Sequence, residues 1–215
     1  MSDLAGLHIV VTGGSGALGR AVVEHLSVAG ATCHAPDHDE LDLTDEAAVT
    51  AYYQRLPPLW ASVQVAGGYA GGPFGVTSLA DFRRQMEMNL TTCFLCCREA
   101  VKSMRAAGGA PGGRIVNVAA RPAVVPVGGM VAYSASKAAV ASITQSLAEE
   151  LKRDGILVNA VLPSIMDTPA NRAAMPGADY NAWPKVEQVA EAIAFLAGPG
   201  NALASGALVP VYGGA

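Results

Sequence analysis

Apolar runs alternate with helical patterns from one end of this chain to the other, and this alternation constrains the fold more than any other feature. The apolar runs are continuous, as from Ile115 to Val118. Continuous runs are typical of strands that are covered on both faces of a sheet. Repeated strand–helix units need parallel strands with crossover helices on both faces. The sequence therefore predicts an α/β fold, a doubly wound parallel sheet flanked by helices.

Six strands are expected, at residues 7–11, 31–35, 61–66, 114–118, 157–162 and 207–211. Helices are expected at residues 18–29, 47–55, 79–107, 131–153 and 186–197. The glycine-rich run 108–113 is expected to be a turn, and segment 37–45 leaves room only for a trimmed crossover. Because no linker or repeat interrupts this order, residues 1–215 are expected to form a single domain.

Composition and charge exclude several classes of partner. The chain is 51% hydrophobic and 15% charged, which suits a well-buried α/β protein. A net charge of −4 and the lack of a basic run argue against a nucleic-acid partner. No apolar stretch reaches the roughly 18 residues that span a membrane, and the N-terminus lacks a basic signal-peptide region. We therefore expect a soluble, cytoplasmic protein.

Four cysteines, Cys33, Cys93, Cys96 and Cys97, raise the question of a metal or redox site. The last three formally contain a C-x-x-C spacing. No second Cys or His pair lies at the spacing of zinc ligands, and the cluster falls inside an apolar helical stretch. We expect no metal, and interpret the cluster as small buried or interfacial thiols of a reducing compartment.

A glycine-rich turn follows the first expected strand and leads into a helix. Gly14, Gly16 and Gly19 fit the G-x-G-x-x-G spacing in this strand–turn–helix setting. Glycines let the backbone approach a pyrophosphate, and the helix N-terminus offers free N–H groups to it. The turn therefore predicts a Rossmann-type dinucleotide site. The residues expected to bind the cofactor here are Gly13, Ser15, Gly16, Ala17, Leu18 and Gly19.

Asp37 ends the second expected strand, roughly 20 residues beyond the turn, where such folds carry a ribose-binding acid. Its carboxylate would bond the adenosine ribose hydroxyls and repel a 2′-phosphate, which favours NADH. The neighbouring His34 and His38 leave NADP open. A solvated turn aspartate is the alternative interpretation of Asp37.

Four residues follow in the segment Asp42-Leu43-Thr44-Asp45. Asp42 and Leu43 are expected at the adenine edge of the cofactor. Thr44 and Asp45 are expected to cap the next helix instead.

Tyr133 and Lys137 lie four residues apart in an expected helix, so their side chains share one face. A nearby ammonium favours the ionised phenol and is expected to lower the pKa of Tyr133 toward neutrality. Such a tyrosine suits general acid/base chemistry on a substrate oxygen. Because pairs with this spacing often arise by chance, other motifs of the chain are needed to identify this pair as catalytic.

These motifs, in order, resemble the short-chain dehydrogenase/reductase family over almost the whole chain. Besides the turn, Tyr133 and Lys137, the matching segments are Ala66-Gly67-Gly68, Met88-Asn89-Leu90, Pro163-Ser164-Ile165-Met166-Asp167-Thr168 and the ending 209–214. The resemblance implies that Lys137 binds the nicotinamide ribose and that Asn89 supports a proton-relaying water. It also implies that the cofactor contacts Ala66, Gly67, Gly68, Pro163, Ile165 and Thr168. A homo-oligomer, dimer or tetramer, formed through helices 79–107 and 131–153 is implied as well.

Three positions depart from the family pattern, namely Ala17, Val65 and Ala120, the last standing where the family has its catalytic serine. Losing such a donor costs on the order of a hundredfold to a thousandfold in rate. The segments 16–19, 65–72 and 129–133 resemble dihydropteridine reductases, whose electrophilic quinonoid substrate needs no serine. Segments 88–90 and 158–163 resemble the 3-oxoacyl-carrier-protein reductases instead.

We interpret the chain as an NAD(P)-dependent short-chain oxidoreductase. It would pass hydride between the nicotinamide and a small carbonyl or quinonoid, pterin-like substrate, with Tyr133 as general acid/base. The alternative, motivated by Ala120, is a catalytically weak NAD-binding sensor or scaffold. A sugar-nucleotide epimerase would suit the glycine spacing, but the chain is short for the separate substrate domain of such enzymes.

Overall fold

The computed structural model describes residues 4–106 and 112–214. They form a six-stranded sheet of order β2-β1-β3-β4-β5-β6 in which every pairing is parallel. The strands are β1 (His8–Thr12), β2 (Thr32–His34), β3 (Ala61–Gln64), β4 (Arg114–Val118), β5 (Leu157–Pro163) and β6 (Leu208–Val211). All six expected strands are present, with bounds that differ by one or two residues at most ends.

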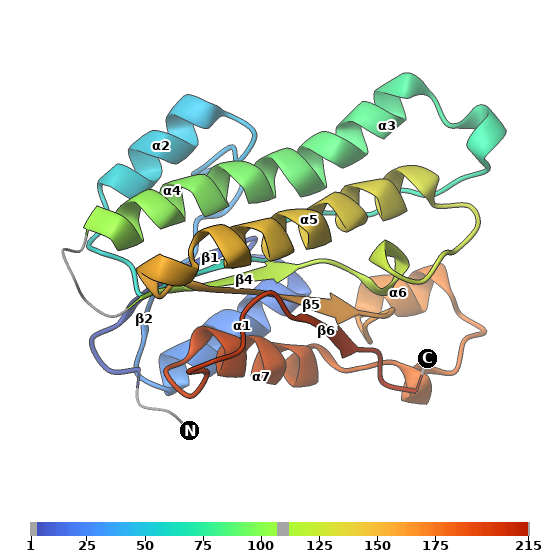
Figure 1. The fold of residues 1–215 in the computed structure, drawn as a ribbon. Helices are drawn as coiled ribbons and strands as arrows, with labels where there is room; N and C mark the ends of the chain where they lie inside the picture. The colour runs from blue at the N-terminus through green and yellow to red at the C-terminus, as the bar shows by residue number, and fades with distance from the viewer. Residues whose placement is uncertain (1–3, 107–111, 215) are drawn as a thin grey trace.

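Helices cover both faces of the sheet (Figure 1). One face carries α1 (Ala17–Val28) and α7 (Val186–Ala197), and the other carries α2 (Glu46–Gln54), α4 (Thr92–Ala106) and α5 (Val131–Glu150). Each layer has its own apolar core: Val11, Val22 and Ile193 are fully buried on the first face. Ile115 and Leu162 belong to the core of the second. The predicted doubly wound Rossmann-type fold, in one domain, is confirmed.

The order of the strands determines where a ligand can bind. The chain leaves β1 for β2 on one side and then crosses back to β3 on the other, so the connections diverge between β1 and β3. In open parallel sheets, such a divergence leaves a crevice at the carboxyl ends of the strands. The turn after β1 and the segment after β3 both lie at this edge of the sheet.

The long helix expected at residues 79–107 is interrupted. It consists of α3 (Leu79–Met86), a π-helical turn η2 (Glu87–Thr91) and α4. The Thr92 hydroxyl donates to the Met88 carbonyl at 2.8 Å within the wider turn. The π-helical turn rotates Asn89 into the protein, where it is 1% exposed. Residue 107 and most of the expected turn 108–113 lie outside the described residues.

The ends of β3 and α5 also differ from the sequence-based expectation, for local reasons. β3 stops at Gln64 because the Ala66 N–H donates to the Thr12 hydroxyl at 3.2 Å rather than to a neighbouring strand. α5 stops at Glu150, and a 3₁₀ turn η4 (Lys152–Asp154) leads into Gly155, whose φ of +67° favours glycine. Short pieces that carry no clear periodicity were not expected. They are α6 (Pro169–Ala174) and the 3₁₀ turns η1 (Phe74–Val76), η3 (Arg121–Ala123) and η5 (Tyr180–Ala182).

The cysteine cluster belongs to the core of the chain itself. Cys93, Cys96 and Cys97 are buried in the layer under α4, and all four cysteines are free thiols. Within the described ranges, no group of three His, Cys, Asp or Glu side chains is placed to hold a metal ion. Across the same part of the chain, no helix combines the length and apolarity required to cross a membrane.

Candidate active site

A cleft of about 1470 Å³ lies at the carboxyl edge of the sheet. Drug-sized ligands occupy pockets of about 300–1,000 Å³, so this cleft has room for a dinucleotide and a small substrate. It is lined by every predicted site residue except Asn89. Those residues are Gly13, Ser15, Gly16, Ala17, Leu18, Gly19, Asp37, Asp42, Leu43, Ala66, Gly67, Gly68, Tyr133, Lys137, Pro163, Ile165 and Thr168.

The glycine turn is packed too tightly for side chains. Gly13 has φ of +68°, and its carbonyl accepts the Gly16 N–H at 3.0 Å. A Cβ on Gly19 would lie 2.0 Å from the Gly13 oxygen. Gly16 precedes α1 and offers no side-chain cap, so no side chain competes for the first N–H groups of that helix. This cradle fits the pyrophosphate of a dinucleotide, because backbone donors and the helix dipole both favour an anion there.

Asp37 is exposed at the mouth of the cleft, directly after β2. Its Oδ1 accepts the Glu40 N–H at 2.9 Å, so the residue does stabilise a turn. Its other carboxylate oxygen has no hydrogen-bond partner among the described residues, and Asp37 lines the cleft. Both interpretations of Asp37 are therefore compatible in one conformation.

The next segment corrects one expectation. Asp45 caps α2 as expected, because its carboxylate accepts from the N–H groups of Ala47 and Ala48 at 2.9 and 3.1 Å. Thr44 does not cap the helix. Its hydroxyl and its N–H both donate to Asp42, at 2.7 and 2.9 Å, because this short loop closes on itself. These bonds lower the pKa of Asp42 and hold its carboxylate at the cleft.

Asn89 sits behind the cleft and joins three segments. Its Oδ1 accepts the Gly68 N–H at 3.0 Å, and its Nδ2 donates to the Gly68 carbonyl at 3.0 Å. The same Nδ2 donates to the Ser136 hydroxyl at 3.1 Å, which in turn donates to the Tyr133 carbonyl at 2.8 Å. Asn89 thus positions the segment after β3 against the helix that carries Tyr133. Sequence reasoning missed Ser136, although it lies between Tyr133 and Lys137.

Tyr133 and Lys137 do lie together at the cleft, but their ionisation differs from expectation. Burial lowers the pKa of Lys137 to about 8. Burial also raises the pKa of Tyr133 to about 12, and Tyr69 adds to this rise. The Lys137 ammonium donates to the Val118 carbonyl at 2.8 Å. The expected lowering of the Tyr133 pKa is therefore wrong for this structure, because burial disfavours the ionised phenol.

Tyr69 is a site residue that sequence reasoning did not select. Its ring meets that of Tyr133 edge-on, with centroids 5.1 Å apart and planes at 88°. The side chain is 61% exposed and lines the cleft. The available sequence signal was an aromatic residue within the glycine-rich segment 67–72.

The end of β4 carries no hydroxyl at the cleft. Ala119 and Ala120 are buried there and line the wall beside Tyr133. Arg121 follows, half-buried, and its guanidinium lies 5.3 Å from the centre of the Tyr212 ring. Ser164 also lines the cleft, but its hydroxyl donates to the Tyr212 carbonyl at 2.6 Å. Arg121 is a second site residue that sequence reasoning missed, because it has no periodic or motif signal.

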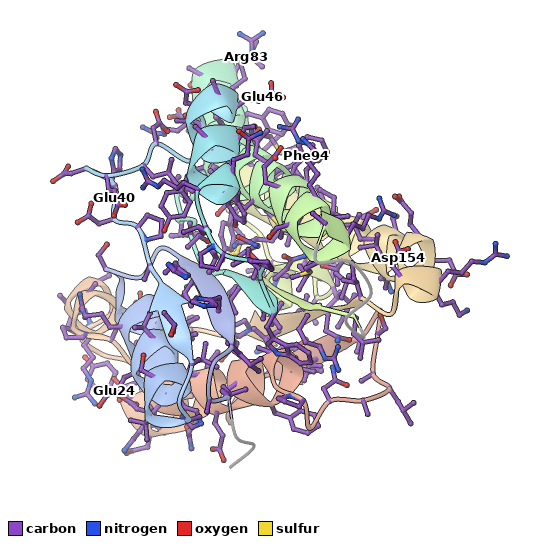
Figure 2. All side chains as sticks on the ribbon, turned by 90° about the vertical axis from the view of Figure 1, so that its left-hand side faces the viewer. Glu24, Glu40, Glu46, Arg83, Phe94 and Asp154 are labelled. Atoms are coloured by element: carbon purple, nitrogen blue, oxygen red, sulfur yellow. The ribbon has the colours of Figure 1, made fainter. Side chains whose placement is uncertain are left out.

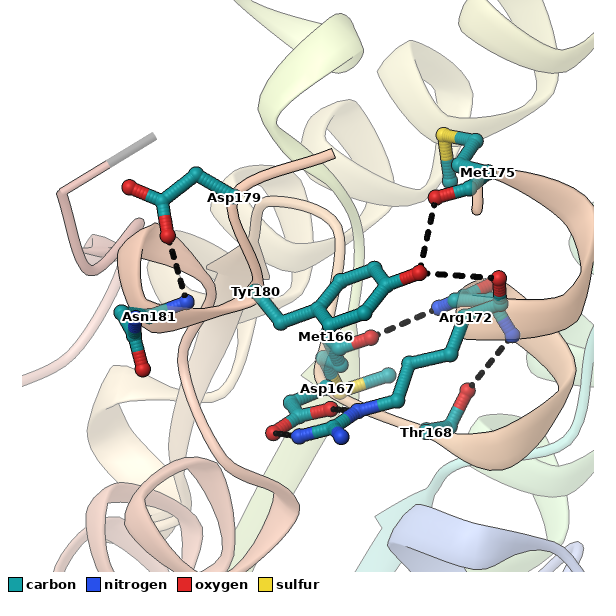
Figure 3. Close-up of polar contacts among 9 residues, drawn as sticks. Met166, Asp167, Thr168, Arg172, Met175, Asp179, Tyr180 and Asn181 are labelled. Carbon is teal, nitrogen blue, oxygen red and sulfur yellow. Dashed lines mark hydrogen bonds and ion pairs between the residues drawn. The ribbon is translucent and has the colours of Figure 1, made fainter. Parts of the chain in front are cut away.

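The segment after β5 forms a short, braced lid, shown in Figure 3. Asp167 and Arg172 make a two-bond ion pair, with nitrogen–oxygen distances of 2.6 and 2.8 Å. The Tyr180 hydroxyl bonds the carbonyls of Met175 and Arg172 at 3.2 and 3.3 Å. These contacts tie residues 167, 172, 175 and 180 of the lid to one another.

Thr168, at the start of α6, has the capping role that a threonine before a helix usually has. Its hydroxyl oxygen accepts the Asn171 N–H at 3.2 Å (Figure 3). A hydroxyl that accepts one bond still has its hydrogen to donate. Because Thr168 also lines the cleft, capping leaves it able to contact a ligand.

Comparisons with known proteins agree with this geometry. The family model "short chain dehydrogenase" matches residues 37–178. The cis-4-hydroxycyclohexanecarboxylate dehydrogenase of Sinomonas cyclohexanicum is 38% identical, over 80% of this chain and 74% of that protein. The galactitol 2-dehydrogenase of Rhizobium johnstonii is 33% identical over 98% of this chain and 95% of its own length.

Among solved structures, a blue fluorescent protein from a metagenomic library, in complex with NADPH, superposes with a TM-score of 0.86. It is 28% identical, and the match covers 99% of this chain and 98% of that one. Fold, cleft and relatives define an oxidoreductase that uses a nicotinamide cofactor. The chain belongs to the short-chain dehydrogenase/reductase family.

The glycine cradle gives a first prediction. In Gly19→Ala, the new Cβ would meet the Gly13 oxygen at 2.0 Å, so the turn must open. Overpacking costs about 1–3 kcal/mol, and we expect NADH to bind about tenfold more weakly or worse. Fluorescence titration with NADH measures the affinity. Gly75→Ala is the matched control, because a Cβ there has nothing within 4 Å. Equal affinities in the two variants would show that the cradle does not hold the cofactor.

Lys137 gives a second prediction, in the pH dependence of stability. Its pKa is about 8 in the folded protein against an ordinary 10.5. Between these values the unfolded chain binds the additional proton, so the free energy of unfolding rises with pH from about 8 to 10.5. Tyr133 acts in the opposite direction and at higher pH. Because its pKa is raised to about 12, it lowers the free energy of unfolding only from pH 10.0 upward.

Urea unfolding from pH 7 to 10 measures this contribution of Lys137. We expect the free energy of unfolding of Lys137→Met to rise less above pH 8 than that of wild type, because this variant has no buried ammonium to neutralise. Lys152→Met, which removes an exposed lysine, is the control. A rise above pH 8 that is the same in Lys137→Met and wild type would contradict the assignment.

Proposed function

We propose that this chain interconverts a secondary alcohol and a ketone on a small ring or polyol substrate, with NADH preferred over NADPH. The observation that carries the proposal is that Tyr133 and Lys137 line the same cleft as the glycine cradle. The named relatives, dehydrogenases of a hydroxycyclohexane acid and of galactitol, support this substrate class.

The bound nicotinamide would supply or accept the hydride, and the chain's own residues handle the proton. A Tyr133 with a pKa of about 12 is protonated at neutral pH, so it is ready to donate to a ketone oxygen. Lys137 uses one of its three donors on Val118. The other two remain for the nicotinamide ribose hydroxyls. Ribose hydroxyls that donate hydrogen bonds to Tyr133 would favour its ionised form, which suits the reverse, alcohol-oxidising direction.

Ala120 affects which substrates can react. Without a hydroxyl at this position, the substrate oxygen receives less hydrogen bonding in the transition state. A quinonoid pterin would tolerate that loss, but the named relatives act on ring alcohols and sugar alcohols. We therefore take the small carbonyl as the proposed substrate and quinonoid dihydrobiopterin as the comparison.

A catalytically weak sensor or scaffold is the second candidate function, and Ala120 is the observation that favours it. A protein of this kind would still bind NADH in the cradle. It would turn over neither ketones nor the pterin. Turnover, rather than binding, therefore separates the two functions.

We also propose that the chain forms a homo-oligomer. Phe94 points outward from α4 and is 49% exposed (Figure 2), and Val131 on α5 is 46% exposed. Large apolar side chains exposed on neighbouring helices support a contact between copies of the chain. Sedimentation velocity would report the assembly directly.

Tyr133→Phe tests the proton donor. Loss of a general acid costs about 10²–10⁴-fold, so we expect ketone reduction to fall by that factor while NADH affinity changes little. Tyr52→Phe is the control, because Tyr52 is buried and does not line the cleft. Steady-state oxidation of NADH with cyclohexanones and quinonoid dihydrobiopterin measures the rates. Full activity of Tyr133→Phe would rule out the proposed donor, and inactivity of wild type on all substrates would favour the scaffold.

Asp37→Asn tests the preference for NADH. Asparagine keeps an oxygen for the Glu40 N–H but removes the charge that would repel a 2′-phosphate. We expect kcat/KM with NADPH relative to NADH to rise about tenfold or more. Asp39→Asn removes a neighbouring carboxylate that does not line the cleft and serves as the control. An unchanged ratio in Asp37→Asn would leave Asp37 with the turn role alone.

A further inference from the structure

Arg121 lies at the substrate end of the cleft. It follows Ala120 at the carboxyl end of β4, whereas Asp37 follows β2. In the strand order β2-β1-β3-β4 these ends are three strand spacings apart, or about 14 Å at the usual separation of neighbouring strands. Arg121 is therefore remote from the adenosine side and belongs to the wall that Tyr133 also lines.

The Arg121 guanidinium has no anionic partner within the chain. Across residues 4–106 and 112–214 it makes no ion pair, and its side chain donates no hydrogen bond. By contrast, half-buried Arg98 pairs with two carboxylates, and buried Arg114 donates to two carbonyls. A half-buried arginine that is left unpaired beside a large cleft is available to a ligand.

Tyr212 holds the guanidinium in place without using its donors. The guanidinium carbon lies 5.3 Å from the ring centre. A cation over a ring is held without a hydrogen bond from the guanidinium, so its N–H groups stay free to donate. Such an edge matches a carboxylate with two parallel hydrogen bonds.

The surroundings of Arg121 are apolar and lack a competing acid. Val125, Val127, Met130 and Ile165 line the same cleft, and three of them are 36–42% exposed. Asp37 and Asp42 belong to the adenosine side. Glu87, on the π-helical turn, also lines the cleft but is not paired with Arg121. This end of the cleft suits an apolar body that carries one anionic group.

We propose that the substrate is a carboxylate-bearing ring alcohol or ketone, and that Arg121 binds its carboxylate and so determines specificity. This inference rests on the proposed function for the reacting end of the substrate. The carboxylate on Arg121 and the oxygen on Tyr133 would fix both ends of the ring, and the apolar side chains would cover its body. Arg121 acts on binding and orientation, and the proton transfer remains with Tyr133.

A binding experiment tests Arg121 without any turnover. Calorimetry on the NADH-saturated protein compares cyclohexanecarboxylate with the neutral cyclohexanecarboxamide. We expect the acid to bind wild type at least about tenfold more tightly, since hydrogen bonds between charged groups carry this much affinity. Arg121→Met should weaken binding of the acid by about 10- to 100-fold and leave binding of the amide unchanged. The affinity of Arg121→Lys for the acid should lie between those of wild type and Arg121→Met, because lysine keeps the charge but lacks the planar guanidinium.

Arg105→Met is the charge-matched control, because it removes one arginine at the exposed pair with Asp154 on the far end of α4. It should bind both probes like wild type. Equal affinity of wild type for the acid and the amide would overturn the proposal. An equal loss of affinity for both probes in Arg121→Met would also overturn it, because it would indicate a packing role against Tyr212.

Turnover separates this inference from the proposed function. With NADH, 4-oxocyclohexanecarboxylate should be reduced with a lower KM than 4-methylcyclohexanone, and Arg121→Met should abolish that difference with kcat little changed. If both ketones react equally, the carboxylate specificity is wrong while the proposed function stands. If neither reacts but the acid binds through Arg121, the proposed function fails and the binding site remains.

Discussion

The buried amide of Asn89 is the interaction on which the arrangement of the cleft depends. It bonds both backbone groups of Gly68 and, through Ser136, the helix that carries Tyr133. Leaving buried partners of this kind unpaired costs about 1–3 kcal/mol each, so the three segments are held in one geometry. A Cβ on Gly67 would lie 2.5 Å from the Asn89 oxygen, which explains the glycine there. The π-helical turn η2 delivers Asn89 to this position, in keeping with the frequent placement of such turns at functional sites.

Burial decides the electrostatics of the cleft. Lys137 and Tyr133 were expected to influence each other chiefly by charge, yet desolvation shifts both toward their neutral forms. A partly neutral lysine and a protonated phenol form a site whose acid/base balance responds to what enters it. The same cleft leaves Arg121 unpaired, so a fixed positive charge lies in the cleft that Tyr133 and Lys137 also line. Apolar side chains, among them Val125, Val127 and Ile165, line the same cleft.

Much of the fold could be predicted, because strand burial and helix periodicity are local patterns. The six strands and the positions of α1, α5 and α7 follow from such patterns, as does the glycine turn. The break at Glu87–Thr91 could not be predicted, since π-helical geometry there is associated with contacts that Asn89 makes with distant Gly68 and Ser136. Tyr69 and Arg121 were missed for the same reason: their significance lies in neighbours from other segments, namely Tyr133 and Tyr212.

The sequence by itself determined the layer architecture, the cradle for the dinucleotide, the Tyr133–Lys137 pair and the absence of a hydroxyl at Ala120, since each depends on residue type and short spacing. Only the tertiary structure decided the ionisation of that pair, because burial is a property of the whole fold. It likewise decided that Thr44 bonds Asp42 rather than capping α2. Finally, only the tertiary fold set Arg121, which follows β4, against Tyr212, which follows β6, since these residues are far apart in sequence.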